Sequence, residues 1–345
     1  MRKFLPLAAG LVLTSTALAS TEGSSWLELD ADIAQLSTTA VEADGAKVTG
    51  FLRAYFNSDS DADLQGWAFE HIRIEANAKV EGYKVRLSTE MKSGTARLAD
   101  AWAYWELTDG VMARAGNFKQ PFLSTFGFLR GSHRLFHKVT NSADHGKREA
   151  GLALNGKLME KKLGWWVAAM NGVDGASEDH SFYGRVAYDF GEKSAFSKFE
   201  GAIDAPEDGF NVSASLAYND DQNDAAGGQR MAVEVVGEGS GLYVHAEMVE
   251  YDEDFVGADK LLGTALMDTN PLAFTGAYMV GDDMELALRY EDFDDAADSN
   301  RMTLGFNYYQ VLPHTVKWQL AYTDLSSDTA ALEAEVITVG LTIGF

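Results

Sequence analysis

The residues with the most distinctive spacing form a cationic stripe near the middle of the chain. They recur at relative positions 0, 3, 4, 7 and 8: Arg130, His133, Arg134, His137 and Lys138. On a helix these positions make one continuous face, and Leu135, Phe136 and Val139 fall away from it. The spacing predicts a short helix whose basic side would attract anions and whose apolar side could pack on a wall.

The cationic stripe lies in a basic island of an acidic chain. Between Met112 and Lys162 there are ten Lys or Arg residues against three Asp or Glu, whereas the whole chain has 28 against 52 and a net charge of −24. Phosphates would be repelled by so acidic a chain, which argues against nucleic acid as a partner. The chain has no cysteine, so a disulfide framework, a thiolate metal site and a cysteine nucleophile are excluded.

The same region holds the clustered residues that a hydrolase would need. They are Ser132, His133, His137, Asp144 and His145. His133 and His137 are four residues apart, as in a zinc-binding helix, but the glutamate that follows the first histidine in metalloproteases is replaced by Arg134. Three alternating aspartates from Asp59 onward lack the rest of a calcium loop. We therefore expect no catalytic residues, no metal site and no cofactor.

Most of the chain alternates apolar and polar residues with a period of two, which is typical of β-strands. Turn residues bound sixteen such segments: Lys47–Asn57, Gly66–Lys79, Gly82–Lys92, Arg97–Leu107, Val111–Lys119, Arg148–Leu158, Leu163–Met170, Phe182–Phe190, Gly209–Asn219, Arg230–Val236, Gly241–Tyr251, Pro271–Val280, Met284–Phe293, Asn300–Gln310, Thr315–Thr323 and Val336–Phe345. Their number, and about 20 residues per strand and connection, suit an outer-membrane barrel. A soluble β-sandwich is the alternative for this alternation.

The two ends of the chain support export to a bacterial outer membrane. Met1-Arg2-Lys3, the apolar run from Phe4 to Leu18 and the small-residue triplet that ends at Ala19 have the three parts of a signal peptide. The last strand keeps its period of two up to Phe345, and a terminal aromatic resembles the assembly signal of outer-membrane barrels. We expect a signal peptide at 1–19, a short periplasmic segment at 20–45 and a transmembrane β-barrel at 46–345.

Short links between the strands alternate with longer, acidic ones, as periplasmic turns alternate with external loops in such barrels. The third long link contains the cationic stripe, and the third external loop of porins often folds into the barrel. We therefore expect an all-β, antiparallel transmembrane barrel of about sixteen strands, with an infolded third loop that aims its cations into the pore. A solvated external loop is the alternative. The link from Gly191 to Asp208 is too long for its periplasmic side, so a strand could be miscounted there.

Strand parity places further cations on the inner wall of this barrel. Those that we add to the pore constriction are Arg53, Arg73 and Arg114, with Lys119 at the root of the third loop. Acidic residues share the same inner parity, among them Glu75 and Asp100. A wall of mixed charge keeps a pore hydrated but does not alone establish anion preference.

Several short motifs are similar to those of one family of bacterial porins. They are Gly116-Asn117-Phe118-Lys119-Gln120-Pro121-Phe122, Arg148-Glu149-Ala150-Gly151-Leu152, Asn171-Gly172 and Thr303-Leu304-Gly305-Phe306-Asn307-Tyr308-Tyr309. Together they make the mature chain resemble the phosphate-selective porin O and P family. The resemblance implies a trimeric sixteen-stranded barrel that passes phosphate or polyphosphate along a ladder of arginines and lysines, with Lys119 in a matching motif.

These observations favour an outer-membrane porin for passive diffusion of small hydrophilic solutes, with a preference for anions such as phosphate. Its expected partners are these solutes, the surrounding lipid and lipopolysaccharide, and two further copies in a homotrimer. The alternatives are a structural or adhesive barrel and, less favoured, an outer-membrane hydrolase.

Overall fold

The computed structural model describes most of the chain beyond its N-terminal segment. The described residues are 46–59, 64–92, 95–129, 131–136, 139–141, 148–172, 179–191, 200–222, 227–311 and 314–345. All described residues belong to one compact unit, Gly45–Phe345. The expected signal peptide and periplasmic segment lie outside the described residues, and so do Arg130, His137 and Lys138.

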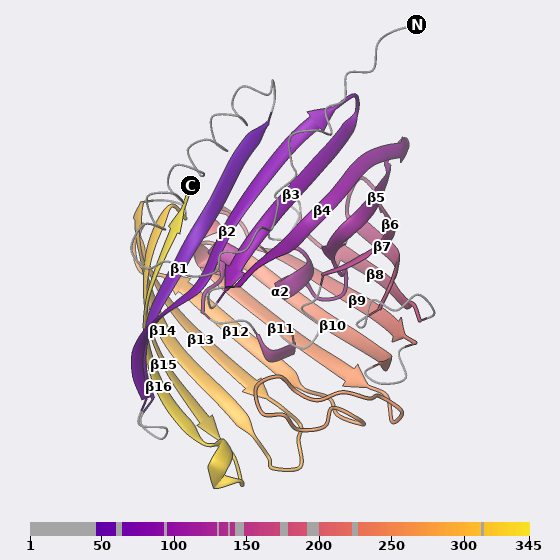
Figure 1. Ribbon diagram of the computed structural model, residues 1–345. Helices are drawn as coiled ribbons and strands as arrows, with labels where there is room; N and C mark the ends of the chain where they lie inside the picture. Colours follow the sequence, from indigo (N-terminus) through magenta and orange to yellow (C-terminus); the bar gives the residue numbers. More distant parts are fainter. Residues whose placement is uncertain are drawn as a thin grey trace, which may run out of the picture. The chain divides into compact units, whose positions relative to one another are not determined.

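The described part of the chain forms a closed antiparallel β-barrel (Figure 1). Its strands are β1 (Lys47–Asp59), β2 (Leu64–Val80), β3 (Tyr83–Lys92), β4 (Thr95–Thr108), β5 (Val111–Lys119), β6 (Arg148–Leu158), β7 (Leu163–Met170), β8 (Ser181–Asp189), β9 (Asn211–Asp221), β10 (Gly228–Gly239), β11 (Leu242–Tyr251), β12 (Leu272–Met279), β13 (Met284–Asp292), β14 (Asn300–Val311), β15 (Val316–Ser326) and β16 (Ala334–Gly344). Each strand pairs with the next along the chain, and β16 pairs with β1 to close the barrel.

The predicted strands are confirmed, and three of them have the predicted bounds. These are β5, β6 and β7. Because β8 pairs directly with β9, with Ser181 opposite Asp221 and Asp189 opposite Ser213, no strand lies between them. The suspected miscount between Gly191 and Asp208 is therefore wrong, and this segment needs another explanation. The helices within the described residues are short, and none of them is long and apolar enough to cross a membrane.

The two faces of the wall differ in polarity because successive side chains of a strand point to opposite sides. On β14 the buried, inward side chains alternate with exposed apolar ones: Arg301, Thr303 and Asn307 against Met302, Leu304 and Tyr308. The barrel therefore presents an apolar outer face and a charged inner face, which is the arrangement that a bilayer requires.

The outward position of Leu304, whose surface is 48% exposed, yields a prediction about stability. Leu304→Arg should lower the free energy of unfolding by about 2–4 kcal/mol if the site lies near the bilayer midplane, because the charge would face hydrocarbon. Urea unfolding in lipid vesicles measures this cost, with Leu304→Met as the matched control. Equal unfolding midpoints for the two variants would contradict the assignment of this face to lipid.

Candidate pore constriction

The described residues of the loop between β5 and β6, which spans residues 120–147, lie inside the barrel. It carries a four-residue helix, α2 (Ser124–Gly127), and a 3₁₀ turn, η1 (Gly131–His133). The backbone N–H of Ser124 donates to Glu234 of β10 at 2.8 Å, and the hydroxyl of Thr125 donates to Glu247 of β11 at 2.8 Å. Neither strand neighbours β5 or β6 in the wall, so the β5–β6 loop crosses the lumen to reach them.

A second set of bonds fastens the far end of the β5–β6 loop. The N–H of Thr140 donates to Glu291 of β13 at 2.7 Å, and Arg301 of β14 donates to the Thr140 hydroxyl at 2.7 Å. Arg301 and Glu291 also form a buried ion pair at 2.6 Å. The inward carboxylates of β10, β11 and β13 thus satisfy polar groups of the loop that would otherwise be buried without partners.

The cationic stripe does not form the predicted helix in its described residues. After η1, residues 134–136 are not helical. Wall side chains bind the backbone oxygens here: Arg53 of β1 donates to Gly131 O, Lys317 of β15 to Arg134 O, and Gln319 of β15 to Leu135 O. In an α-helix these oxygens would instead accept N–H groups four residues ahead, so the wall replaces the helix as partner of the backbone.

The apolar side chains of the stripe do pack on the wall, as predicted. Leu135 and Phe136 are buried in a cluster with small residues of β12, β13 and β15. Glycine at position 305 on β14 leaves room for the ring of Phe136, because a Cβ there would overlap this ring in its present position. The spacing of the apolar residues was therefore informative although the helix was wrong.

The link between β8 and β9 also enters the barrel and meets the β5–β6 loop. Glu200 accepts the N–H of Leu135 at 3.1 Å, and its own N–H donates to His133 O at 3.0 Å. Arg289 of β13 pairs with the Glu200 carboxylate, and the N–H of Ala202 donates to Glu285 at 2.6 Å. The contacts of this β8–β9 link inside the barrel explain why the link is longer than an ordinary periplasmic turn.

The described stripe residues are buried and contact other parts of the barrel, so their side chains do not face the pore as exposed cations. Arg134 is buried and donates to Thr125 O at 3.2 Å. His133 is also buried, with its ring stacked on His314 at a centroid distance of 4.1 Å. Lys119 likewise donates to Phe126 O at 2.8 Å and to Leu129 O at 2.6 Å, which holds α2 against β5.

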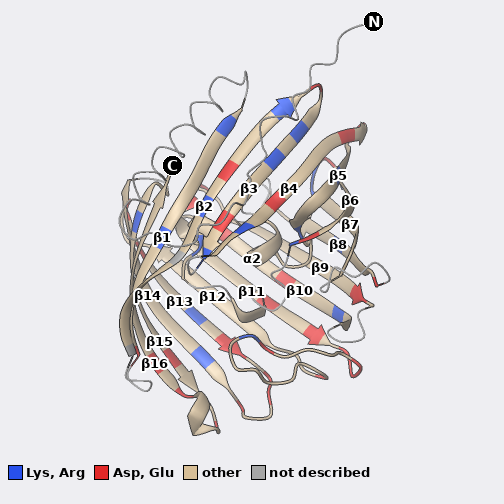
Figure 2. Ribbon diagram, in the orientation of Figure 1, with Lys and Arg blue, Asp and Glu red and all other residues tan. Residues whose placement is uncertain are grey.

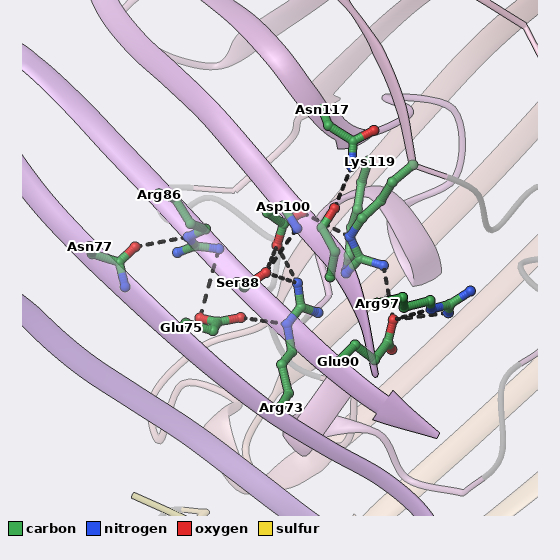
Figure 3. A network of polar contacts seen from close by, with 12 residues as sticks. Arg73, Glu75, Asn77, Arg86, Ser88, Glu90, Arg97, Asp100, Asn117 and Lys119 are labelled. Atoms are coloured by element: carbon green, nitrogen blue, oxygen red, sulfur yellow. Dashed lines mark hydrogen bonds and ion pairs between the residues drawn. The ribbon is translucent and has the colours of Figure 1, made fainter. Parts of the chain in front are cut away.

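A network of charged residues covers the inner wall of β2, β3 and β4 (Figure 3). At its centre Asp100 pairs with Arg73 and, at 2.8 Å, with Arg148, while Ser88 donates to it at 3.0 Å. Arg73 also reaches Glu75 at 2.9 Å. Figure 2 shows Lys and Arg positions interleaved with Asp and Glu along these strands. The Glu75 and Asp100 carboxylates are thus engaged in ion pairs with arginines.

An open cavity of about 260 Å³ lies between this wall and α2 with the residues after it. Its lining brings together Arg73, Glu75, Arg86, Asp100, Trp102, Arg114, Phe118, Lys119, Pro121, Gly127, Phe128, Leu129, Ala153, Asn155 and Trp166. Four of these side chains are cationic and two are acidic, although the chain as a whole is strongly acidic. The wall contributes the charges, and the β5–β6 loop contributes apolar surface.

Known structures share this architecture. The chain has the fold of a bacterial porin. It superposes on OmpF of Salmonella typhi, solved with daunomycin, with a TM-score of 0.64 and 13% identity over 87% of this chain and 97% of that one. The outer-membrane channel DcaP of Acinetobacter baumannii superposes with a TM-score of 0.56 and 14% identity over 88% of this chain and 98% of that one. A Rhodopseudomonas blastica porin variant superposes with a TM-score of 0.57 and 14% identity over 87% of this chain and 100% of that one.

At these identities the likeness establishes the fold alone. No protein-family model matches the chain, and no curated protein does either. The resemblance to the phosphate-selective family therefore stays an interpretation of the motifs. The porin fold and the apolar outer face place the barrel in a bacterial outer membrane.

Three buried residues beneath α2 could in principle hold a metal ion. In the described chain Glu234, His245 and Glu247 are the group whose ligand atoms lie within 4.8 Å of one another. Glu234 already binds Ser124 and Arg185, and Glu247 binds Thr125. His245 Nε2 lies 3.5 Å from Glu234 and 3.9 Å from Glu247. We therefore assign the group to attachment of the loop.

Sequence reasoning identified the inward arginines but missed the aromatic residues among them. Trp102 and Tyr104 share the parity of Asp100 on β4 and so face the lumen. Trp102 lines the cavity, and both rings contact Arg114. Alternation alone could have found them. No sequence signal pointed to Glu200, because this residue lies in the link between β8 and β9, where the strand alternation does not apply.

The attachment of α2 to Glu234 generates a prediction about loop motion. Glu234→Gln keeps the shape but weakens charge-assisted bonds, each worth about 1.5–3 kcal/mol, to Ser124 and Arg185. We expect larger open-channel current noise and more variable single-channel conductance, because the loop would move within the lumen. The control Glu250→Gln changes an exposed acid of β11. Equal noise in the parent and both variants would show that this bond does not restrain the loop.

Proposed function

We propose that this protein is a passive porin of the bacterial outer membrane that prefers small anions. The carrying observation is the charge of the cavity, where four cationic side chains meet two acidic ones. Both acids, Glu75 and Asp100, are engaged with Arg73, so they add little field for a passing cation. Low-dielectric walls focus the remaining positive field on the solution inside the pore.

The solute class that best fits this proposal is phosphate or polyphosphate, which the motif resemblance implies. Guanidinium groups match phosphate oxygens in geometry and charge. Among the residues proposed for selectivity, Arg73, Arg114 and Lys119 line the cavity directly. Arg53, Arg134 and Lys119 act by holding the β5–β6 loop, through Gly131 O, Thr125 O and Phe126 O respectively.

A channel is favoured over an enzyme by the placement of the catalytic candidates. Ser132 and His133 are the ones within the described residues, and both are buried away from the cavity lining. A homotrimer, with lipid and lipopolysaccharide around its outer face, is part of the proposal. Cross-linking of the purified protein in detergent tests the trimer.

Selectivity of the wall is tested by Arg86→Gln combined with Arg114→Gln. Both side chains line the cavity, so their removal should leave the pore open while the anion-to-cation permeability ratio falls toward or below one. Reversal potentials across a planar bilayer under a KCl gradient measure this ratio. Arg97→Gln is the control, because the Arg97 side chain is 63% exposed and is not part of the lining. A parent that prefers cations would overturn the proposal, and a parent without conductance would favour a structural barrel.

The cationic stripe has its own test in Arg130→Gln, Arg134→Gln and Lys138→Gln together. If the stripe contributes to the constriction, deletion of three charges should lower the permeability ratio and weaken any block of chloride current by phosphate. The same recordings measure both effects. A reversal potential equal to that of the parent would leave selectivity to the wall arginines.

A further inference from the structure

The guanidinium group of Arg114 is surrounded by aromatic rings instead of carboxylates. It lies 4.9 Å from the ring centroid of Trp102, 5.2 Å from that of Tyr104 and 5.3 Å from that of Phe118. Among the described residues Arg114 has no hydrogen bond or ion pair, and its Nε is buried without a partner. Cation–π contacts hold such a group in place without neutralising its charge or occupying its in-plane donors.

A second arginine shares the same indole. The guanidinium of Arg86 lies 5.3 Å from the Trp102 ring centroid, and the two residues are direct partners across β3 and β4. Its Nε donates to the neutral Asn77 at 2.8 Å, and its nearest carboxylate, Glu75, is 3.9 Å away. Two weakly compensated cations therefore flank one aromatic ring, and a bound anion would relieve their repulsion.

The other side of the cavity is aromatic as well. Phe128 of the β5–β6 loop and Trp166 of β7 pack edge to face with centroids 5.1 Å apart, and both line the cavity. The cavity, at about 260 Å³, is close to the lower end of the roughly 300–1,000 Å³ range of small-molecule sites, which are mostly apolar with a few placed polar groups. An inorganic anion would use the arginines but leave the apolar rings without a partner.

We infer that this cavity binds small carboxylates with a flat aromatic body. The carboxylate would accept paired N–H donors of Arg114, with Arg86 as the second cation, and the ring of the solute would pack against Phe128 and Trp166. This inference rests on the proposed anion-preferring function and adds a substrate class to it. Trp102 positions both guanidinium groups and is thereby the residue that sets the preference.

The test is block of chloride current in a planar bilayer by three probes: benzoate, cyclohexanecarboxylate and inorganic phosphate. Benzoate and cyclohexanecarboxylate carry the same charge and differ in the flat ring. Benzoate should block the parent channel at a lower concentration than cyclohexanecarboxylate does. Trp102→Leu and, separately, Phe128→Leu should each raise the half-blocking benzoate concentration about 3- to 30-fold, the range for one cation–π or aromatic contact, and should change phosphate block less.

Arg114→Lys separates charge from shape. It keeps the positive charge and so should keep the reversal potential, but it loses the planar pair of donors and should weaken benzoate block. Arg97→Gln is again the control and should leave benzoate block unchanged. Equal block by benzoate and cyclohexanecarboxylate in the parent would overturn this inference, as would equal effects of Trp102→Leu and Arg97→Gln. An anion-preferring parent without ring discrimination would leave the proposed function intact, whereas a cation-preferring parent would overturn both.

Discussion

The structure depends on how a wide barrel satisfies the backbone of the segments inside it. Sixteen strands enclose a lumen that their own side chains cannot fill, so a segment that enters brings N–H and C=O groups away from bulk water. Here buried carboxylates of the wall accept the N–H groups, as Glu234 does for Ser124 and Glu291 for Thr140. Wall cations such as Lys317 donate to the C=O groups. Many inward charges are therefore structural.

This use of charge divides the wall into two regions with different consequences for a solute. On β10, β11 and β13 the buried acids Glu234, Glu247 and Glu291 are bonded to the inserted segments, so they contribute little field to the pore. On β2 to β5 the acids are bonded to arginines, which leaves Arg86 and Arg114 as cations with little compensation. The field inside thus depends on the partners of each charge rather than on the net charge of −24.

The strands could be predicted because a barrel wall imposes a period of two on every segment that builds it, and β5, β6 and β7 matched to the residue. The infolded loop followed from loop order and from the apolar residues Leu135 and Phe136, which do pack on the wall. The helix of the stripe was wrong because helical spacing says nothing of competing partners. Lys317 and Gln319 lie more than 180 residues away in sequence and take the carbonyls that a helix needs.

The aromatic surround of Arg114 bears on how a pore keeps a cation available. A carboxylate beside an arginine compensates its charge, as Asp100 and Glu75 do beside Arg73, whereas burial of an arginine without a partner is costly. Aromatic faces offer a third arrangement: they attract the guanidinium through the ring quadrupole while the net charge and the in-plane donors persist. One wall therefore contains two kinds of arginine. Some are paired with carboxylates, whereas Arg114, held by Trp102 and Tyr104, keeps its charge available to a solute.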